Sequence, residues 1–209
     1  MAYIQITTRC NMVCDHCCYR CGPEGEDMSL EVYKAALAMD DETVSIGGGE
    51  PTLHPQFWEF IGLALGHCDY VWLATNGSLK ETSLALARMA KKEVLGCELS
   101  LDDFHDYDMV DPQVRIAFQA LPHAIRDVTN RGERDPIRAG RFKEYSDEGE
   151  GREDCPCSEF MVKPNGDVMT CGCEDSPRLG NVLTGYEIPE DYEWGECWKH
   201  QEAGTLVSV

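Results

Sequence analysis

Residues 3–17 (YIQITTRCNMVCDHC) place three cysteines directly after a predicted strand, and residues 44–51 (VSIGGGEP) end a second strand on three glycines and an acid. Cys10, Cys14 and Cys17 follow the spacing C-x3-C-x2-C. Three thiolates on one loop can hold three irons of a four-iron cluster and leave the fourth iron open. An open coordination position separates a catalytic metal site from a closed structural one.

Zinc is the alternative metal at this loop, with His16 or Cys18 as a fourth ligand. Zinc sites usually show paired C-x2-C or histidine spacings, which this loop lacks. The glycine-rich strand end favours the cluster, because glycine lets a backbone approach a ligand closely and Glu50 can accept hydrogen bonds from an ammonium group. The two motifs together therefore predict a metal centre beside a small-molecule site.

Short apolar runs alternate with amphipathic stretches along the first part of the chain. β-Branched and aromatic runs bounded by turns predict strands, and apolar residues at helical spacing predict helices. The predicted strands are residues 3–7, 44–46, 70–74, 97–100 and 125–128, and the predicted helices lie at 29–37, 57–65, 84–90 and 112–121. Such alternation implies a parallel sheet. About 150 residues are too few for an eight-unit barrel of about 250, so we expect an open, partial TIM-like barrel of about five or six β/α units.

Composition limits what the chain can be. Its 209 residues carry a net charge of −20 and twelve cysteines. No apolar run approaches the roughly 18 residues of a membrane-spanning helix, and no signal peptide opens the chain. We therefore expect a cytoplasmic protein with reduced, metal-binding cysteines and no membrane partner. The acidic charge argues against a nucleic-acid partner, because affinity for a phosphate backbone depends on lysine and arginine.

An acidic, glycine-containing segment at residues 145–154 is typical of a linker. We place a domain boundary there, so that residues 1–148 form the barrel and residues 149–209 form a small cysteine-rich β-hairpin domain. Pro164-Asn165-Gly166 predicts the hairpin turn between two alternating strands. The hairpin would bring cysteines before and after it together as a clamp for a metal.

The N-terminal motifs resemble those of the radical S-adenosylmethionine (radical SAM) enzymes, whose signature is C-x3-C-x2-C after strand one and GGEP after strand two. The resemblance implies that Cys10, Cys14 and Cys17 bind a [4Fe–4S] cluster whose open iron is chelated by SAM. It implies oxygen-sensitive chemistry, in which reductive cleavage of SAM yields a 5′-deoxyadenosyl radical that abstracts hydrogen from a substrate. It also implies that the strand end contacts SAM, through Gly48, Gly49 and Glu50.

Weaker matches extend this resemblance. Thr75-Asn76-Gly77 is similar to a TNG segment that often follows strand three in the family. Ser100-Leu101-Asp102 is similar to an SLD segment near the SAM ribose and the substrate, and Gly140-Arg141 to a GR pair before C-terminal cysteines. The resemblance thus implies that Ser100 and Arg141 contact SAM. His16 departs from the family pattern, in which an aromatic residue commonly precedes the third cysteine.

The C-terminal segment resembles the SPASM and twitch extensions of radical SAM enzymes, whose core reads C, about ten residues, G-x4-C, then GN and an aliphatic residue. Five cysteines, where a full SPASM domain carries about seven, imply a single auxiliary [4Fe–4S] cluster. Zinc is the alternative, although paired zinc knuckles usually run C-x2-C and these pairs run C-x-C. The expected ligands are Cys155, Cys171 and Cys197, with Cys157 and Cys173 competing for the fourth position.

Three residues outside the two ligand sets are candidates for catalysis: Cys18, Asp102 and His105, of which the imidazole or carboxylate could act as a general base. We expect a peptide or amino-acid-like substrate, because SPASM and twitch enzymes often modify ribosomally made peptides. A ferredoxin or flavodoxin would supply electrons. Two alternatives remain open: the same chemistry on a nucleoside or nucleotide, free or polymer-borne, and a non-enzymatic iron–sulfur or zinc protein.

Overall fold

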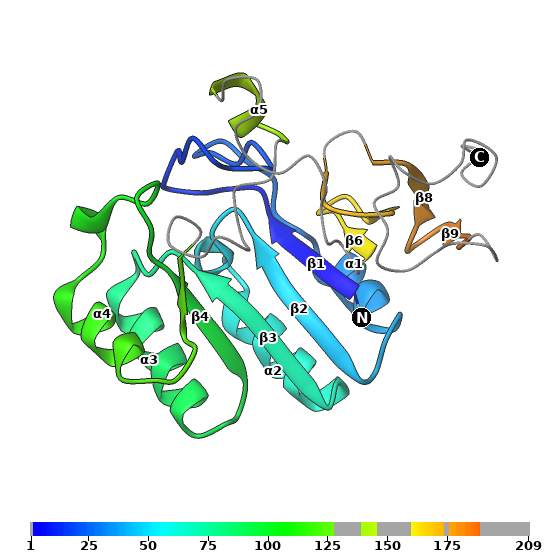
Figure 1. The fold of residues 1–209 in the computed structure, drawn as a ribbon. Helices are drawn as coiled ribbons and strands as arrows, with labels where there is room; N and C mark the ends of the chain where they lie inside the picture. The colour runs from blue at the N-terminus through cyan, green and yellow to red at the C-terminus, as the bar shows by residue number, and fades with distance from the viewer. Residues whose placement is uncertain (1, 128–138, 146–159, 174–175, 189–209) are drawn as a thin grey trace.

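A computed structural model describes residues 2–127, 139–145, 160–173 and 176–188 of the chain. Its strands join into one nine-stranded sheet (Figure 1). In chain order they are β1 (Ala2–Thr7), β2 (Thr43–Gly48), β3 (Tyr70–Thr75), β4 (Gly96–Ser100), β5 (Ile125–Arg126), β6 (Phe160–Val162), β7 (Asp167–Met169), β8 (Arg178–Asn181) and β9 (Gly185–Tyr186). Across the sheet the order is β5-β4-β3-β2-β1-β6-β7-β8-β9.

Strands β1 to β5 are parallel, and helices connect them. The helices are α1 (Leu30–Leu37), α2 (Phe57–His67), α3 (Lys80–Lys91), α4 (Pro112–Gln119) and α5 (Phe142–Tyr145), with 3-10 turns η1 (Pro51–Leu53) and η2 (Tyr107–Met109). In Figure 1, α1 and α2 lie behind the sheet, and α3 and α4 lie beside β4. The predicted α/β class and open, partial barrel are confirmed.

Local signals explain where the helices begin. The Ser29 hydroxyl accepts a hydrogen bond of 3.2 Å from the Val32 amide, which satisfies an otherwise unpaired N–H in the first turn of α1. Asp111 caps α4 in the same way, accepting from the Gln113 amide at 2.8 Å. The predicted helix boundaries therefore agree with the structure to within a few residues.

The core lies between the parallel strands and the helices. Ile4, Ile46, Leu73 and Leu99 come from four successive strands and have no exposed surface. On the helical side, the Tyr33 and Phe60 rings of α1 and α2 stack with centroids 3.9 Å apart. Burial of one such side chain contributes about 1.5–3 kcal/mol, so the core holds the strand ends, and the loops that follow them, in a fixed relation.

The predicted C-terminal hairpin is present, with β6 and β7 antiparallel about the turn at residues 164–166. Gly166 adopts a φ of +87°, the left-handed conformation that such turns require. β6 also pairs in parallel with β1, with Phe160 opposite Ala2. The hairpin thus extends the same sheet, while the boundary between residues 148 and 149 lies outside the described residues and stays a prediction.

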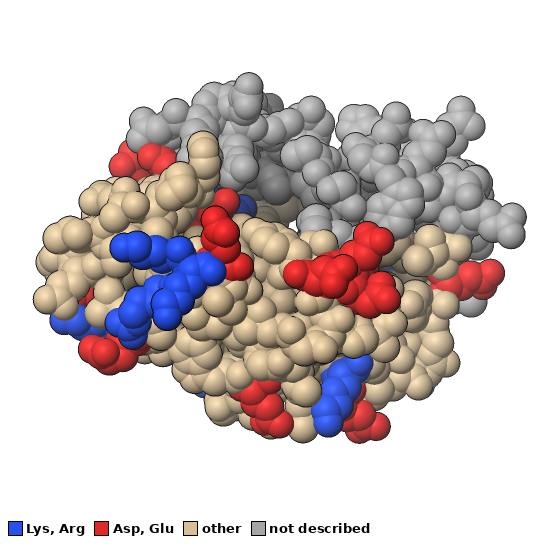
Figure 2. Space-filling model, turned by 90° about the horizontal axis from the view of Figure 1, so that it is seen from below, with Lys and Arg blue, Asp and Glu red and all other residues tan. Residues whose placement is uncertain are grey.

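The face below the sheet in Figure 1 carries charges of both signs. In Figure 2, basic side chains gather mainly on one side of this face, and acidic side chains form separate groups across it. The described part of this face shows no continuous basic surface, in agreement with the net charge of −20. None of the helices in the described ranges is long and apolar enough to cross a membrane.

Candidate functional site

The cysteine loop leaves the carboxyl end of β1 and returns before α1. Backbone hydrogen bonds close its base: the Thr8 amide donates to the Glu26 carbonyl at 2.9 Å, and the Cys10 amide donates to the Gly22 carbonyl at 2.7 Å. The Arg9 guanidinium adds an ion pair of 2.7 Å with Asp27. The two ends of the loop are therefore joined by backbone hydrogen bonds and an ion pair.

The end of β2 contacts the start of this loop and supports it; we call this contact the seat of the loop. The Gly49 amide donates to the Thr7 carbonyl and the Glu50 amide to the Arg9 carbonyl, each at 2.8 Å. A Cβ atom on Gly49 would lie 2.3 Å from the Arg9 carbonyl oxygen, and one on Gly48 would lie 2.3 Å from that of Thr7. These glycines thus permit contact between β2 and the cysteine loop, a role that the sequence analysis had not foreseen.

Glu50 links the ends of β2 and β3. Its side chain is buried, and Oε1 accepts hydrogen bonds from the Thr52 amide at 3.1 Å, the Thr52 hydroxyl at 2.6 Å and the Thr75 hydroxyl at 2.8 Å. Oε2 accepts from the Asn76 amide at 2.6 Å. Burial raises the pKa of Glu50, and these hydrogen bonds oppose the rise. The carboxyl group is thus occupied mainly by the protein itself, and its predicted contact with SAM stays a prediction.

A chain of amide side chains connects β3 with the cysteine loop. Asn76 Nδ2 donates to Asn11 Oδ1 at 3.0 Å and lies 3.9 Å from Cys10 Sγ, to which it also donates. Asn11 Nδ2 in turn donates to the Ser78 hydroxyl at 2.8 Å. Sequence reasoning noted Asn76 only as part of a TNG segment and missed Asn11 and Ser78, whose contacts depend on the meeting of two distant strand ends.

The donor set of the loop fits an iron–sulfur cluster. None of Cys10, Cys14 and Cys17 is in a disulfide. Cys10 Sγ accepts hydrogen bonds from the Met12 amide at 3.4 Å and from Asn76, and such bonds to sulfur stabilise cluster thiolates. Burial raises the pKa of the Cys14 thiol to about 12. A cluster would displace the thiol protons, because thiolates are the metal ligands.

The pKa of the Cys17 thiol is lowered, in contrast to that of Cys14. A hydrogen bond from the Cys21 thiol lowers the pKa of Cys17, and the same pairing raises the pKa of Cys21. The two thiols thus form a coupled pair in which Cys17 is the more readily ionised member. The predicted ligand role of Cys17 stays a prediction.

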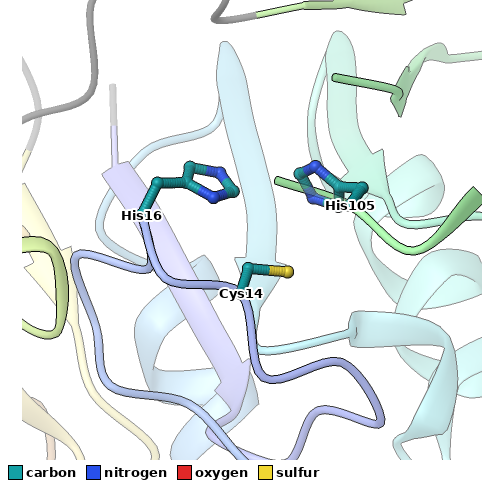
Figure 3. Close-up of side chains that lie close together, drawn as sticks. All are labelled: Cys14, His16 and His105. Carbon is teal, nitrogen blue, oxygen red and sulfur yellow. The ribbon is translucent and has the colours of Figure 1, made fainter. Parts of the chain in front are cut away.

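Cys14 also faces two histidines (Figure 3). Ligand atoms of Cys14, His16 and His105 lie within 4.8 Å of one another, the only such group of three among the described residues. His105 Nδ1 donates to Asp102 Oδ1 at 2.7 Å, which leaves Nε2 available. Two candidates for catalysis, Asp102 and His105, therefore meet directly, and His105 also lies close to Cys14 of the cysteine loop.

Burial and charge set the ionisation of this group. Burial lowers the pKa of His16 to about 4, so this ring is neutral at pH 7. Burial raises the pKa of Asp102, but the hydrogen bond and charge of His105 outweigh it and hold the pKa below its ordinary value. Asp102 Oδ2 and His16 Nδ1 are buried and have no hydrogen-bond partner within the described part of the chain. The site thus holds polar atoms that a ligand could satisfy.

Arg141 lies against the backbone of the cysteine loop. Its Nη1 donates to the Cys14 carbonyl at 2.7 Å, and its Nη2 donates to the Cys21 carbonyl at 2.6 Å. The guanidinium group thereby fastens the loop, and the predicted contact of Arg141 with SAM stays a prediction. Ser100 is the last residue of β4, so it lies at the carboxyl end of the parallel strands, where the cysteine loop also begins. Its predicted contact with SAM stays a prediction.

The predicted ligands of the second cluster are only partly described. Cys171 and Cys173 follow β7 and are buried. Cys171 Sγ accepts a hydrogen bond of 3.4 Å from the Cys173 amide, the same local geometry as Cys10 with Met12. The remaining predicted ligands lie outside the described residues: Cys155, Cys157 and Cys197.

Comparison with known proteins agrees with this geometry. The sequence model of the radical SAM superfamily matches residues 4–138. The mycofactocin maturase MftC of Mycolicibacterium smegmatis is 28% identical over 133 residues, which are 61% of this chain and 34% of that protein. The antilisterial bacteriocin subtilosin biosynthesis protein AlbA of Bacillus subtilis is 33% identical over 107 residues, which are 48% of this chain and 24% of that protein. The chain thus spans about a third or less of the length of these relatives.

A solved structure of native anSMEcpe with bound AdoMet has a similar fold. Its TM-score is 0.57 at 17% sequence identity, and the match covers 88% of this chain and 78% of the other. At this identity the likeness concerns the fold alone.

Proposed function

Because the chain belongs to the radical SAM superfamily, we propose that it is an enzyme that cleaves SAM reductively at a [4Fe–4S] cluster and abstracts hydrogen from a substrate. The superfamily uses this cluster and SAM as its cofactors. The observation that carries the proposal is the seating of the cysteine loop on the glycine-rich end of β2. Hydrogen bonds from Gly49 to Thr7 and from Glu50 to Arg9 hold Cys10 beside that strand end.

Cys10, Cys14 and Cys17 would hold the cluster. When bound, the cluster supplies the electron that breaks a C–S bond of SAM and so generates a 5′-deoxyadenosyl radical. The protein's own groups prepare this site, since the Met12 amide donates to Cys10 Sγ and Arg141 fixes the loop backbone. The proposed contacts to SAM come from Gly48, Gly49 and Glu50 at the end of β2 and from Ser100 at the end of β4. Arg141, which binds the backbone of the cysteine loop, is the fifth proposed contact.

We place the substrate beside Asp102 and His105, at the end of β4. The carboxylate of Asp102 orients the imidazole through the 2.7 Å hydrogen bond and leaves Nε2 to exchange a proton with a bound group. A peptide is the proposed substrate class, supported by the names of the relatives, a mycofactocin maturase and a subtilosin biosynthesis protein. Because the chain spans only part of those proteins, the substrate is proposed on likeness in the shared region.

The proposal has three further parts. A second [4Fe–4S] cluster lies in the region after residue 148, a ferredoxin or flavodoxin donates electrons, and the protein acts in the cytoplasm. The buried Cys171, with its amide-to-sulfur hydrogen bond, supports the second cluster, because the same arrangement occurs at Cys10.

The test is SAM cleavage by the full chain. Wild-type protein is reconstituted anaerobically with iron and sulfide, supplied with SAM and dithionite, and assayed for 5′-deoxyadenosine. We expect product from the wild type and none from Cys14→Ala. Cys68→Ala is the matched control, because this thiol is buried just after α2 and, among the described residues, donates to the Asp40 carbonyl. Equal yields from Cys14→Ala and the wild type would refute the site.

The substrate class needs its own measurement. Candidate peptides deuterated along the side chains are added to the same assay, and the mass of 5′-deoxyadenosine is determined. Transfer of deuterium from a peptide supports the proposed class. Transfer from a nucleoside and not from any peptide refutes it while leaving the SAM chemistry intact.

A further inference from the structure

Cys17 and Cys18 are neighbours in the chain but pack in different places. Cys17 packs against the main core of the barrel, together with Cys10. Cys18 instead packs against a separate small cluster made of Ala139, Cys171 and Cys173. Cysteines from opposite ends of the chain therefore pack in one small cluster, and none of them belongs to the proposed first ligand set.

Two glycines make this meeting possible. A Cβ atom on Gly140 would lie 2.3 Å from the Cys18 carbonyl oxygen, and Gly140 has a φ of +57° that other residues rarely adopt. A Cβ atom on Gly172 would lie 2.7 Å from Cε1 of the Tyr19 ring. The backbone of Cys18 and the ring of Tyr19 thus fit directly onto the segments at 139–141 and 171–173. The contact is a close fit on both sides.

Cys18, Cys171 and Cys173 together offer the donor atoms of a metal site. A single buried cysteine usually serves as a small apolar residue. Here three converge, and Cys171 Sγ already accepts the Cys173 amide at 3.4 Å. Amide donors to sulfur favour a thiolate over a thiol, as at cluster ligands. Thiolate ligands select zinc or iron–sulfur clusters.

At least one pair of these three sulfurs lies farther apart than a single zinc ion would hold them. A tetrahedral zinc with bonds of about 2.3 Å holds its sulfurs about 3.8 Å apart. Cys18, Cys171 and Cys173 do not form a group within 4.8 Å, a limit that in the described ranges only the Cys14 group meets. In a four-iron cluster each thiolate binds a different iron, so its sulfurs lie farther apart.

We propose that Cys18 is a ligand of the second iron–sulfur cluster, together with Cys171 and Cys173. The inference rests on the second cluster of the proposed function and gives Cys18 a ligand's role in place of the catalytic role considered from the sequence. Cys17 and Cys18 would then bind two different clusters through adjacent residues. The backbone between them, held by the hydrogen bond of 2.9 Å from the Arg141 amide to the Cys17 carbonyl, fixes one centre relative to the other.

The experiment compares iron and sulfide content in the full chain after anaerobic reconstitution. With four irons per cluster, we expect about eight irons in the wild type and about four in Cys18→Ala. Cys171→Ala should also bind about four, and Cys18→Ala/Cys171→Ala should lose no more than either single variant. Cys68→Ala controls for loss of a buried thiol and should keep about eight. The electron paramagnetic resonance (EPR) signal of the first cluster, and its change on adding SAM, should persist in Cys18→Ala.

A conservative variant protects the test against misfolding. Cys18→Ser keeps the size of the side chain and offers an oxygen ligand, so its reduced second cluster should show shifted g-values even where iron content is retained. Circular dichroism checks that each variant is folded.

Three different results would each refute a different part of the proposal. A wild type with about four irons refutes the second cluster itself. A wild type with about eight irons, with iron content and g-values unchanged in Cys18→Ala and Cys18→Ser, refutes the role of Cys18 alone. Stoichiometric zinc in place of the second cluster refutes the choice of metal.

Discussion

Arg141 donates a hydrogen bond of 2.7 Å from Nη1 to the carbonyl oxygen of Cys14, a residue on the first loop of the chain. The same residue binds two further carbonyls of that loop, those of Cys17 through its backbone amide and of Cys21 through Nη2. One residue near the end of the barrel region therefore holds the proposed cluster loop at three points. The conformation of the loop therefore depends on a residue 127 positions after Cys14 in the chain.

Replacement of Arg141 by lysine should loosen the loop. Lysine keeps the charge but cannot bind two carbonyls as a planar fork. Loss of a hydrogen bond from a charged donor costs about 1.5–3 kcal/mol, and we expect a decrease of that size in the free energy of unfolding in urea, with lower iron loading. Arg115→Lys is the control, because its guanidinium group makes one exposed hydrogen bond to the Tyr107 carbonyl.

The same variant separates two roles for Arg141. If the guanidinium group serves the loop, stability and iron loading fall together. If stability and loading stay at wild-type values while SAM binding weakens, the contact with the SAM carboxylate is its main role, and the fastening role is wrong.

A methyl group on Gly49 should disrupt the seat of the loop. Its Cβ would lie 2.3 Å from the Arg9 carbonyl oxygen, a backbone atom that cannot move aside without shifting the start of the cysteine loop. Overpacking of this kind costs about 1–3 kcal/mol, so Gly49→Ala should unfold at lower urea and load less iron. Gly62→Ala is the matched control: nothing lies within 4 Å of its Cβ, and alanine in the exposed interior of α2 should stabilise the protein by up to about 1 kcal/mol. Equal stabilities of the two variants would contradict the seating argument.

Much of the fold could be predicted because its signals are local. Apolar periodicity identifies the strands and helices of the barrel, and capping residues such as Ser29 mark where helices begin. The pairing of β6 with β1 could not be predicted, because Phe160 and Ala2 meet only after the whole barrel has formed. A sequence pattern that predicts a hairpin contains no information about which distant strand it will join.

The candidate site divides in the same way. Spacing alone predicts that Cys10, Cys14 and Cys17 are cluster ligands, since this prediction depends on residues close together in the chain. Two features join segments that are far apart in sequence: the hydrogen bond of Asn76 with Asn11, and the packing of Cys18 against the small cluster that contains Cys171. For the same reason the close approach of the β2 glycines to Thr7 and Arg9 could not be predicted, and their predicted contact with SAM stays a prediction.

Stability should fall as the pH decreases below about 6.5, the ordinary pKa of histidine, partly because of His54. Burial lowers the pKa of His54. Its Nε2 donates to the Met28 carbonyl at 3.0 Å, and its Nδ1 accepts from the Gln56 amide at 3.1 Å. A second proton on the ring would face that amide hydrogen. The unfolded chain therefore takes up a proton at a higher pH than the folded chain, and the free energy of unfolding decreases between the two pKa values.

The measurement is urea unfolding of metal-free, reduced protein at several pH values from 7.5 to 5. His54→Asn keeps an acceptor for the Gln56 amide but does not titrate, so its stability should depend less steeply on pH. Part of the slope should remain, because burial also lowers the pKa of His16, to about 4. His67→Asn, at an exposed position on α2, is the control variant for loss of a histidine. A slope unaltered in His54→Asn would show that the His54 ring has the same proton affinity in both states.

Metal-free protein should bind a single tetrahedral metal ion at Cys14, His16 and His105. Their ligand atoms lie within 4.8 Å of one another, and one sulfur with two imidazoles suits zinc or its spectroscopic substitute cobalt. Asp102 orients His105 through a hydrogen bond of 2.7 Å, so Asp102→Asn should weaken cobalt binding by about 10- to 100-fold, as loss of such a supporting partner typically does. His105→Gln should weaken it at least as much.

Cobalt absorption titrations of metal-free protein measure this affinity, with His67→Gln as the control that should leave it unchanged. The iron-loaded wild type should bind no cobalt at this site, because Cys14 cannot serve a cluster and a single ion at once. Cobalt binding that persists with equal affinity in His105→Gln would show that the ion lies elsewhere. Cobalt binding to iron-loaded protein with the spectrum seen in metal-free protein would show that Cys14 is not a cluster ligand, which would also refute the proposed ligand set of the first cluster.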